Sequence, residues 1–228
     1  MTLPSASMVR VLKNCVTPCQ SIRFTQKKIV DGCGKSESCS CWSCHEAVNC
    51  TKQFFCDSCN LIQPPAPKNL FEYVGLPTTF HVDENTLKKN FRQIQSQVHP
   101  DKFAHASEEE KNMSDEHSRM LNEAYKTLTE PLTRAKYLIE ILGDKNSNAD
   151  LDEEELMEMM ERNEEIAEMK TDESLEAEMK KIQKEIESEL ASLGEHFKSK
   201  TMEKAKKSIT KLSYLYSLRT SVNKMLGY

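Results

Sequence analysis

The amino-acid sequence predicts a mainly α-helical protein with three parts: a small metal-bound cysteine-knuckle unit, a helical hairpin and a C-terminal three-helix bundle. Two Cys-x-x-Cys pairs predict the cysteine unit, since each pair can turn both of its sulfurs toward one ion. Apolar residues recur every three or four positions on both sides of a His-Pro-Asp tripeptide, which predicts two helices joined by a short loop. The same period returns after residue 150 and predicts the bundle.

The N-terminal segment is distinguished by its charge. Residues 1–30 hold five basic residues and no acidic one: Arg10, Lys13, Arg23, Lys27 and Lys28. Serine and threonine accompany them without a continuous apolar centre, as is typical of a mitochondrial transit peptide. We therefore expect residues 1–38 to be a transit peptide that is cut between residues 20 and 38 and carries Cys15 and Cys19 away. The mature protein would then reside in the mitochondrial matrix, with or without a cytosolic pool; the alternative is a disordered cytosolic tail.

Residues 39–63 contain the two cysteine pairs, Cys41 with Cys44 and Cys56 with Cys59, separated by eleven residues. Four thiolates can surround one ion tetrahedrally and leave no open position, which indicates a structural site. Zinc is the preferred metal, and iron in a rubredoxin-like site is the alternative. Free or redox-active thiols are a further alternative. Four other residues of this region are candidate substitutes as ligands: Cys33, Cys39, His45 and Cys50.

A unit of this size cannot fold by apolar burial alone, so the ion must contribute folding energy. Trp42, Phe54 and Phe55 are expected to form a minimal core around the metal. Residues 39–63 contain only one basic residue, Lys52, which excludes a phosphate-binding patch and argues against nucleic-acid binding. A stiff linker follows at Pro64, Pro65 and Pro67.

The hairpin is expected within residues 69–143. A short first helix at 69–76 turns Leu70, Phe71 and Val74 inward. Asp83 caps the second helix, which ends at His99 because Pro100 disfavours a helical conformation there. Ser107 and Glu110 form a capping box for the third helix, and Glu130-Pro131 breaks it before a further apolar helix that ends near Gly143. The inward residues of the second and third helices are Leu87, Phe91, Ile94, Val98, Met113, Met120, Leu121, Ala124, Tyr125 and Leu128.

The loop at the hairpin tip resembles that of the J domain, the module that stimulates ATP hydrolysis by DnaK-type 70-kDa heat-shock chaperones. The resemblance comprises His99-Pro100-Asp101, the following Lys102, and basic residues on the preceding helix, namely Lys88, Lys89 and Arg92. It implies that these residues bind the chaperone. Without the resemblance, His99 would be an ordinary loop histidine, Asp101 a helix cap and the basic side a solvated face. A catalytic His/Asp pair is not expected, since no nucleophile stands nearby at a recognisable spacing.

Residues 150–228 predict three helices, at about 152–169, 172–197 and 201–226. The second and third have inward apolar residues at helical spacing: Leu175, Met179, Ile182, Ile186, Leu190, Leu193, Phe197, Met202, Ala205, Ile209, Leu212, Leu215 and Tyr216. The first helix has more apolar residues than one core stripe needs, namely Leu156, Met157, Met159 and Met160. Residues 150–170 also contain ten acidic and two basic residues. An apolar spot rimmed by carboxylates is typical of a protein-docking site; the alternative is a core stripe with a solvated acidic face.

A J domain followed by an acidic helical bundle resembles, over residues 69–228, the HscB family of iron–sulfur cluster co-chaperones. The four-cysteine unit resembles the N-terminal extension of animal members, which bacterial members lack. The resemblance implies that the bundle binds the cluster scaffold protein through Leu156, Met157, Met160, Glu161, Glu164, Glu168 and Tyr214, where Tyr214 replaces a frequent Phe.

The implied function is that of a co-chaperone and not an enzyme. The chain would deliver the scaffold to a mitochondrial DnaK-type chaperone, stimulate its ATPase and promote cluster transfer to recipient iron–sulfur proteins. It has no phosphate-binding loop of its own, and no apolar run long enough to span a membrane. Two alternatives are a general J-domain co-chaperone with other clients and a metal-dependent redox or iron carrier protein.

Overall fold

The computed structural model describes residues 39–49, 53–66, 69–143, 149 and 151–227. The chain divides into two units, Met1–Cys39 and Ser40–Tyr228, and nearly all described residues belong to the second. The expected transit peptide lies outside the described residues, as do Cys15, Cys19, Cys33, Cys50, Lys52, Pro67 and most of the loop between the hairpin and the bundle. None of the described helices is long and apolar enough to cross a membrane.

The cysteine unit is built from two knuckles with the same hydrogen-bond pattern. In each, the first cysteine's N–H donates to a carbonyl five residues on, at 2.8 Å for Cys41 and 2.9 Å for Cys56. Each turn closes on a residue with left-handed backbone, His45 at φ 62° and Asn60 at φ 58°. Strands β1 (Cys39–Ser40) and β2 (Ala47–Val48) pair beside the first knuckle, and one antiparallel bridge lies beside the second. The predicted pair of cysteine knuckles is confirmed.

The core of this unit differs from the one expected. Trp42 packs against the small cluster formed by Cys41, Val48 and Cys56. Phe54 and Phe55 instead pack against the main core of the protein, which also includes Ile62. The expectation that both phenylalanines surround the metal is therefore wrong, because both pack against the main core, where the Phe54 ring meets Tyr73 and His117.

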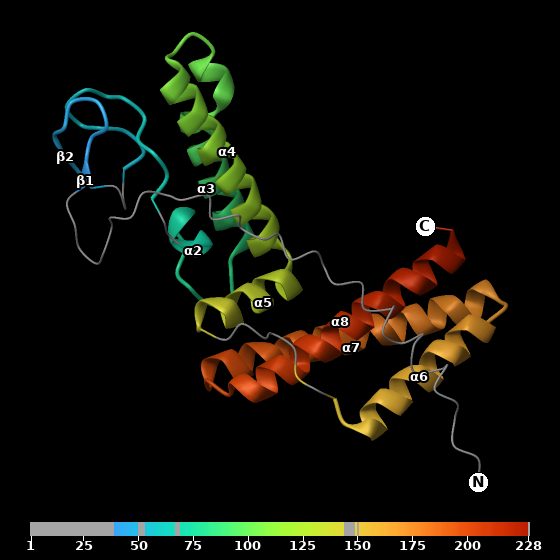
Figure 1. Cartoon of the computed structure of the whole chain (residues 1–228). Helices are drawn as coiled ribbons and strands as arrows, with labels where there is room; N and C mark the ends of the chain where they lie inside the picture. Colours follow the sequence, from blue (N-terminus) through green and yellow to red (C-terminus); the bar gives the residue numbers. More distant parts are fainter. Residues whose placement is uncertain (1–38, 50–52, 67–68, 144–148, 150, 228) are drawn as a thin grey trace, which may run out of the picture. The chain divides into compact units, whose positions relative to one another are not determined.

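The helical hairpin follows the predicted caps closely. It consists of α2 (Leu70–Tyr73), α3 (Glu84–Val98), the 3-10 turn η1 (Pro100–Phe103) and α4 (Glu108–Thr129). Asp83 caps α3, and Ser107 with Glu110 forms the capping box of α4. Helices α3 and α4 run antiparallel and the tripeptide loop joins them at one end (Figure 1). The first helix is shorter than predicted, because Gly75 at φ 70° turns the chain directly after Val74.

Helix α5 (Pro131–Ile141) begins at the predicted break and packs against both α4 and α8. At this junction the Arg134 guanidinium donates to the Leu128 carbonyl at 2.6 Å and lies 5.4 Å from the centre of the Phe80 ring. The Phe80 ring stacks on Phe197 of α7 at 5.4 Å. A Cβ on Gly194 would lie 2.7 Å from the His81 ring, so a larger residue at this position would displace that ring. The hairpin and the bundle therefore share one core.

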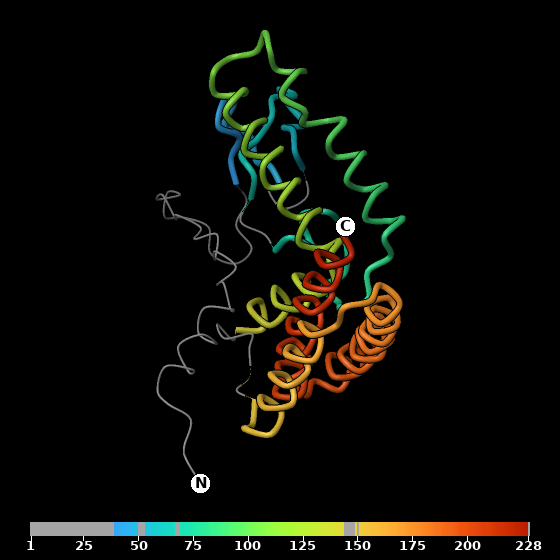
Figure 2. The backbone as a smooth tube through the Cα atoms, turned by 90° about the vertical axis from the view of Figure 1, so that its right-hand side faces the viewer, coloured from blue at the N-terminus to red at the C-terminus, as the bar shows by residue number. Residues whose placement is uncertain are grey.

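The C-terminal bundle contains α6 (Glu153–Glu168), α7 (Asp172–Lys198) and α8 (Met202–Leu226), each within one or two residues of its predicted bounds. Helices α7 and α8 form an antiparallel pair with α6 alongside (Figure 2). The predicted inward residues of α7 and α8 are buried or half-buried. Helix α6 is different, because Ile166 is its only buried side chain.

Candidate functional sites

The four predicted cysteines come together. The sulfurs of Cys41, Cys44, Cys56 and Cys59 lie within 4.8 Å of one another. The two contacts between knuckles, Cys41 to Cys59 and Cys44 to Cys56, are both 3.6 Å. Of the candidate substitutes, Cys39 forms a disulfide and His45 stays outside the cluster. The cluster is close enough to hold one metal ion.

The donor set suits a closed metal centre, since it consists of four sulfurs within reach of one point. Cys41 accepts from the Ser43 N–H at 3.4 Å and from the Gln63 side-chain amide at 3.3 Å. Burial opposes ionisation of Cys41, but hydrogen bonds from the Cys44 and Ser43 backbone outweigh it and lower the pKa of this thiol to about 6. A thiolate is the form that binds metal, so the fold already favours the ligand state at Cys41.

The cysteine unit is joined to the hairpin through a buried polar chain. Gln63 donates from its side chain to Cys41, and its carbonyl accepts from the His117 ring of α4 at 2.8 Å. The other His117 ring nitrogen lies 2.8 Å from the Tyr73 hydroxyl of α2. Phe54 meets both rings edge-on, with centroid distances of 5.3 Å to His117 and 6.0 Å to Tyr73. One residue, Gln63, therefore contacts a cysteine of the four-sulfur cluster and the hairpin at once.

Neither Gln63 nor His117 was predicted as part of a site. His117 is only 2% exposed and lies on α4 between the inward residues Met113 and Leu121, four positions from each. A histidine in an apolar helical stripe is a signal for a buried polar partner, but the sequence does not reveal which segment supplies that partner.

The tripeptide loop has a defined geometry. His99 ends α3 in extended backbone, and its ring nitrogen Nδ1 accepts from the Asp101 N–H at 3.3 Å. The same nitrogen lies 3.6 Å from the Asp101 carboxylate. Phe103 is buried and fixes the far end of η1 to the core. His99, and not Asp101, therefore caps the short turn, while the Asp101 carboxylate stays in solvent.

The predicted basic residues Lys88, Lys89 and Arg92 are exposed on α3, and Lys102 is exposed in the loop beside them. None of the four pairs with a carboxylate among the residues that the structure describes, whereas several other lysines do. Their charges are therefore available to a partner.

The predicted docking face of α6 is exposed. Leu156 is 45% and Met157 60% exposed, which contradicts the alternative that both belong to a core stripe. Met160 is half-buried beside them, and carboxylates at the rim face solvent: Glu161, Glu164 and Glu168. Tyr214 of α8 donates its hydroxyl to the Met159 carbonyl at 2.7 Å, and burial raises its pKa to about 12. Tyr214 therefore anchors the helix that carries the face.

Two family models match the chain. The HSCB C-terminal oligomerisation domain matches residues 151–223, and the DnaJ domain matches residues 69–137. The mouse iron–sulfur cluster co-chaperone protein HscB is 36% identical over 198 residues, covering 83% of each chain.

Solved structures show the same similarity. The crystal structure of the human co-chaperone protein HscB matches with a TM-score of 0.77 and 29% identity, covering 82% of this chain and 98% of that one. Chaperone HscB from Vibrio cholerae matches with a TM-score of 0.65 and 33% identity, covering 70% of this chain and 98% of that one.

Proposed function

This chain belongs to the HscB family of iron–sulfur cluster co-chaperones, and we propose that it binds a cluster scaffold protein and delivers it to a mitochondrial DnaK-type chaperone. It then stimulates the chaperone's ATPase and so promotes cluster transfer to recipient proteins. The observation that carries the proposal is one chain with two separate exposed sites. One is the His-Pro-Asp loop with its unpaired cations, and the other is the apolar face of α6 with its acidic rim.

The chaperone site works by docking and not by catalysis on this chain. Lys88, Lys89 and Arg92 attract an acidic surface of the ATP-bound chaperone and raise the association rate. His99 and Asp101, held in a fixed relation by Pro100, then contact the chaperone and favour its hydrolysis-competent state. ATP is hydrolysed on the partner.

The scaffold site works by apolar burial with a charged rim. Leu156 and Met157 supply exposed apolar surface, half-buried Met160 adds to it, and Tyr214 supports the site by binding the Met159 carbonyl. Methionine side chains adapt their shape to a partner at small cost. Glu161, Glu164 and Glu168 select a scaffold with basic groups around its own apolar patch.

The four cysteines hold one structural metal ion, and zinc fits best because tetrahedral four-thiolate sites without an open position are typical of it. When bound, zinc supplies folding energy to a unit whose own core is too small. We place the protein in the mitochondrial matrix, as its basic, acid-free N-terminal sequence suggests.

The experiment is steady-state ATP hydrolysis by a purified mitochondrial DnaK-type chaperone, with and without its cluster scaffold and with and without this protein. Stimulation that rises synergistically with scaffold is expected. Stimulation that is indifferent to scaffold would indicate a general J-domain co-chaperone, and absence of stimulation would refute the chaperone role. Metal analysis and redox titration of the same sample test the carrier alternative, which needs a redox-active metal.

A further inference from the structure

Helix α6 carries the proposed scaffold-binding face but is lightly packed. Ile166, near its C-terminal end, is its one fully buried side chain. Leu156 and Met157, ten and nine residues before it, face solvent. Apolar burial therefore fixes only one end of the helix, and polar contacts must fix the part that bears the face.

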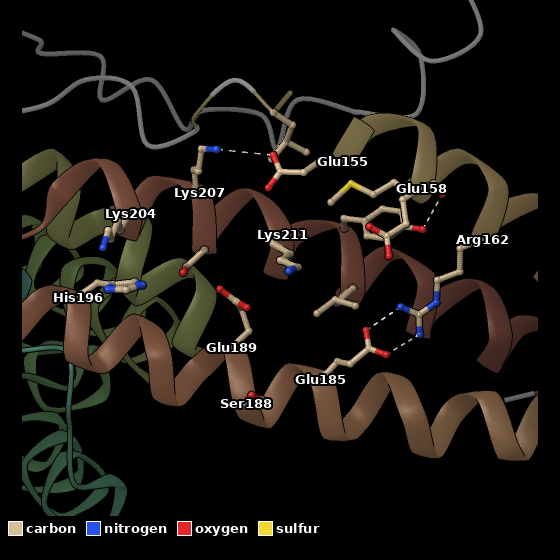
Figure 3. Close-up of a pocket in the computed structure, with 15 residues that line it drawn as sticks. Glu155, Glu158, Arg162, Glu185, Ser188, Glu189, His196, Lys204, Lys207 and Lys211 are labelled. Carbon is tan, nitrogen blue, oxygen red and sulfur yellow. Dashed lines mark hydrogen bonds and ion pairs between the residues drawn. The ribbon is translucent and has the colours of Figure 1, made fainter. Parts of the chain in front are cut away.

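The strongest of these contacts is made by Arg162, whose guanidinium binds the carboxylates of Glu178 and Glu185 on α7. Figure 3 shows the pair with Glu185. The guanidinium donates twice to one oxygen of Glu178, at 2.8 and 3.0 Å. It donates to both oxygens of Glu185, at 2.6 and 3.0 Å. The two glutamates lie two helical turns apart on α7, so the contact restrains the angle between the helices as well as their distance.

The first of these carboxylates is buried. The Glu178 side chain is 7% exposed and is bound also by Lys181 at 3.1 Å. Burial opposes its ionisation, but the hydrogen bonds from Arg162 and Lys181 outweigh burial and keep the pKa of Glu178 below its usual range. A buried carboxylate that loses a paired cation is strongly destabilised, so the contact resists separation of α6 from α7.

The position of Arg162 in the helix suits this task. At 3.6 residues per turn it points about 140° away from Met157 and about 160° away from Met160. It therefore cannot belong to the same exposed face, and its side chain is only 22% exposed. The groove that it borders is lined by α6, α7 and α8 and includes Glu155, Glu189 and Lys211 (Figure 3).

We infer that Arg162 is a positioning residue, which holds the face formed by Leu156, Met157 and Met160 in its binding orientation by clamping α6 to Glu178 and Glu185. The inference rests on the proposed function, because it assigns Arg162 to the scaffold site. Arg162 would thus set how tightly the scaffold binds without touching the scaffold.

The test uses the full chain and compares Arg162→Met, Arg162→Lys and Glu185→Gln. Glu189→Gln is the matched control, since it removes the same charge one turn further along α7, where the carboxylate forms no hydrogen bond or ion pair with α6 among the described residues. Two quantities are measured: scaffold affinity by calorimetry and amide hydrogen exchange along α6. Circular dichroism checks that each variant is folded.

Arg162→Met is expected to weaken scaffold binding about tenfold and to speed exchange in α6 while α4 is unchanged. Glu185→Gln should weaken binding about threefold, because its carboxylate is half exposed. The scaffold affinity of Arg162→Lys should lie between those of the unaltered chain and Arg162→Met, since a lysine ammonium cannot bind both carboxylates in the bidentate way of a guanidinium. Glu189→Gln should change neither quantity.

If the unaltered chain binds the scaffold and both Arg162→Met and Glu185→Gln bind it with unchanged affinity, the role of Arg162 is overturned. The proposed scaffold function would then still stand. An equal loss in Glu189→Gln would overturn the role of Arg162 too, since net charge and not position would then matter. No binding by the unaltered chain would overturn the proposed scaffold function and this inference with it. A misfolded Arg162→Met leaves the decision to Glu185→Gln, which keeps the buried Glu178 paired.

Discussion

His117 joins the cysteine unit to the helical hairpin, and its replacement by alanine tests whether the two parts fold as one. The change removes the ring nitrogen that donates to the Gln63 carbonyl and the ring nitrogen that pairs with the Tyr73 hydroxyl, both at 2.8 Å. The Tyr73 hydroxyl keeps its bond to the His117 backbone carbonyl at 3.2 Å. The change also removes the edge-on contact with Phe54. His105→Ala is the control, because His105 is exposed in the loop before α4.

The magnitude follows from these contacts. Two buried hydrogen bonds contribute about 1 kcal/mol each, and a carbonyl left buried without a donor costs about 1–3 kcal/mol more. An edge-on aromatic contact adds about 0.5–1.5 kcal/mol. The free energy of unfolding of His117→Ala should therefore fall by about 3.5–6.5 kcal/mol, whereas that of His105→Ala should change by about 0.5 kcal/mol or less.

Urea denaturation of the zinc-loaded protein, followed by circular dichroism, measures the free energy of unfolding. A competition titration with a chromophoric chelator measures zinc affinity in parallel. Since coupling between two sites acts in both directions, His117→Ala should also weaken zinc binding. Zinc removal from the unaltered chain should, for the same reason, speed amide exchange in α2 and α4.

Two results would refute this reasoning. One is loss of stability in His117→Ala with unchanged zinc affinity. The other is zinc removal that leaves exchange in α4 as it was. Either would mean that Gln63 lies against the hairpin without transmitting the state of the cysteine unit.

Three further predictions concern the sites themselves. His99→Gln should abolish stimulation of the chaperone ATPase and leave scaffold affinity within twofold of wild type by calorimetry, and an equal loss of both would contradict two separate sites. Replacing Leu156, Met157 and Tyr214 with alanine should do the reverse, with at least a hundredfold loss of scaffold affinity, provided that circular dichroism shows the bundle folded. Cys56→Ser should lower the zinc content measured by atomic absorption to well below one per chain and lower the melting temperature; full zinc content would show that Cys56 is not a ligand.

Helix boundaries were predicted well because their signals are local. Asp83, Ser107 with Glu110, and Pro131 each act within one turn of the chain, and each caps or starts a helix as expected. The cysteine cluster was predicted for the same reason, since each knuckle sets its two sulfurs within four residues. The predicted α2 is too long, because its range included Gly75, whose left-handed backbone turns the chain after Val74.

The exposed residues of both sites could also be recognised, because they depart from the ordinary helical pattern. Leu156 and Met157 add apolar residues that no core stripe requires, and the structure leaves both in solvent. Of the basic residues of α3 only Lys88 has an acidic residue at helical spacing, Glu84, and the structure leaves Lys88, Lys89 and Arg92 unpaired among the described residues. A side chain that binds a partner molecule is apolar or charged where no contact within its own chain requires it. Such a departure from the helical pattern can be recognised in the sequence.

The residues that position these sites carry no such mark. His117 meets Gln63 across 54 positions, and Arg162 meets Glu185 across 23. In the sequence of α6, Arg162 is a single basic residue among many acidic ones. In the sequence of α7, Glu178 and Glu185 cannot be told apart from the solvent-exposed glutamates around them. Only the packing of α6 on α7 makes Glu178 buried and Arg162 necessary to it. Function on this chain therefore divides into a contacting layer that local sequence can predict and a positioning layer that only tertiary structure reveals, and the variants above separate the two experimentally.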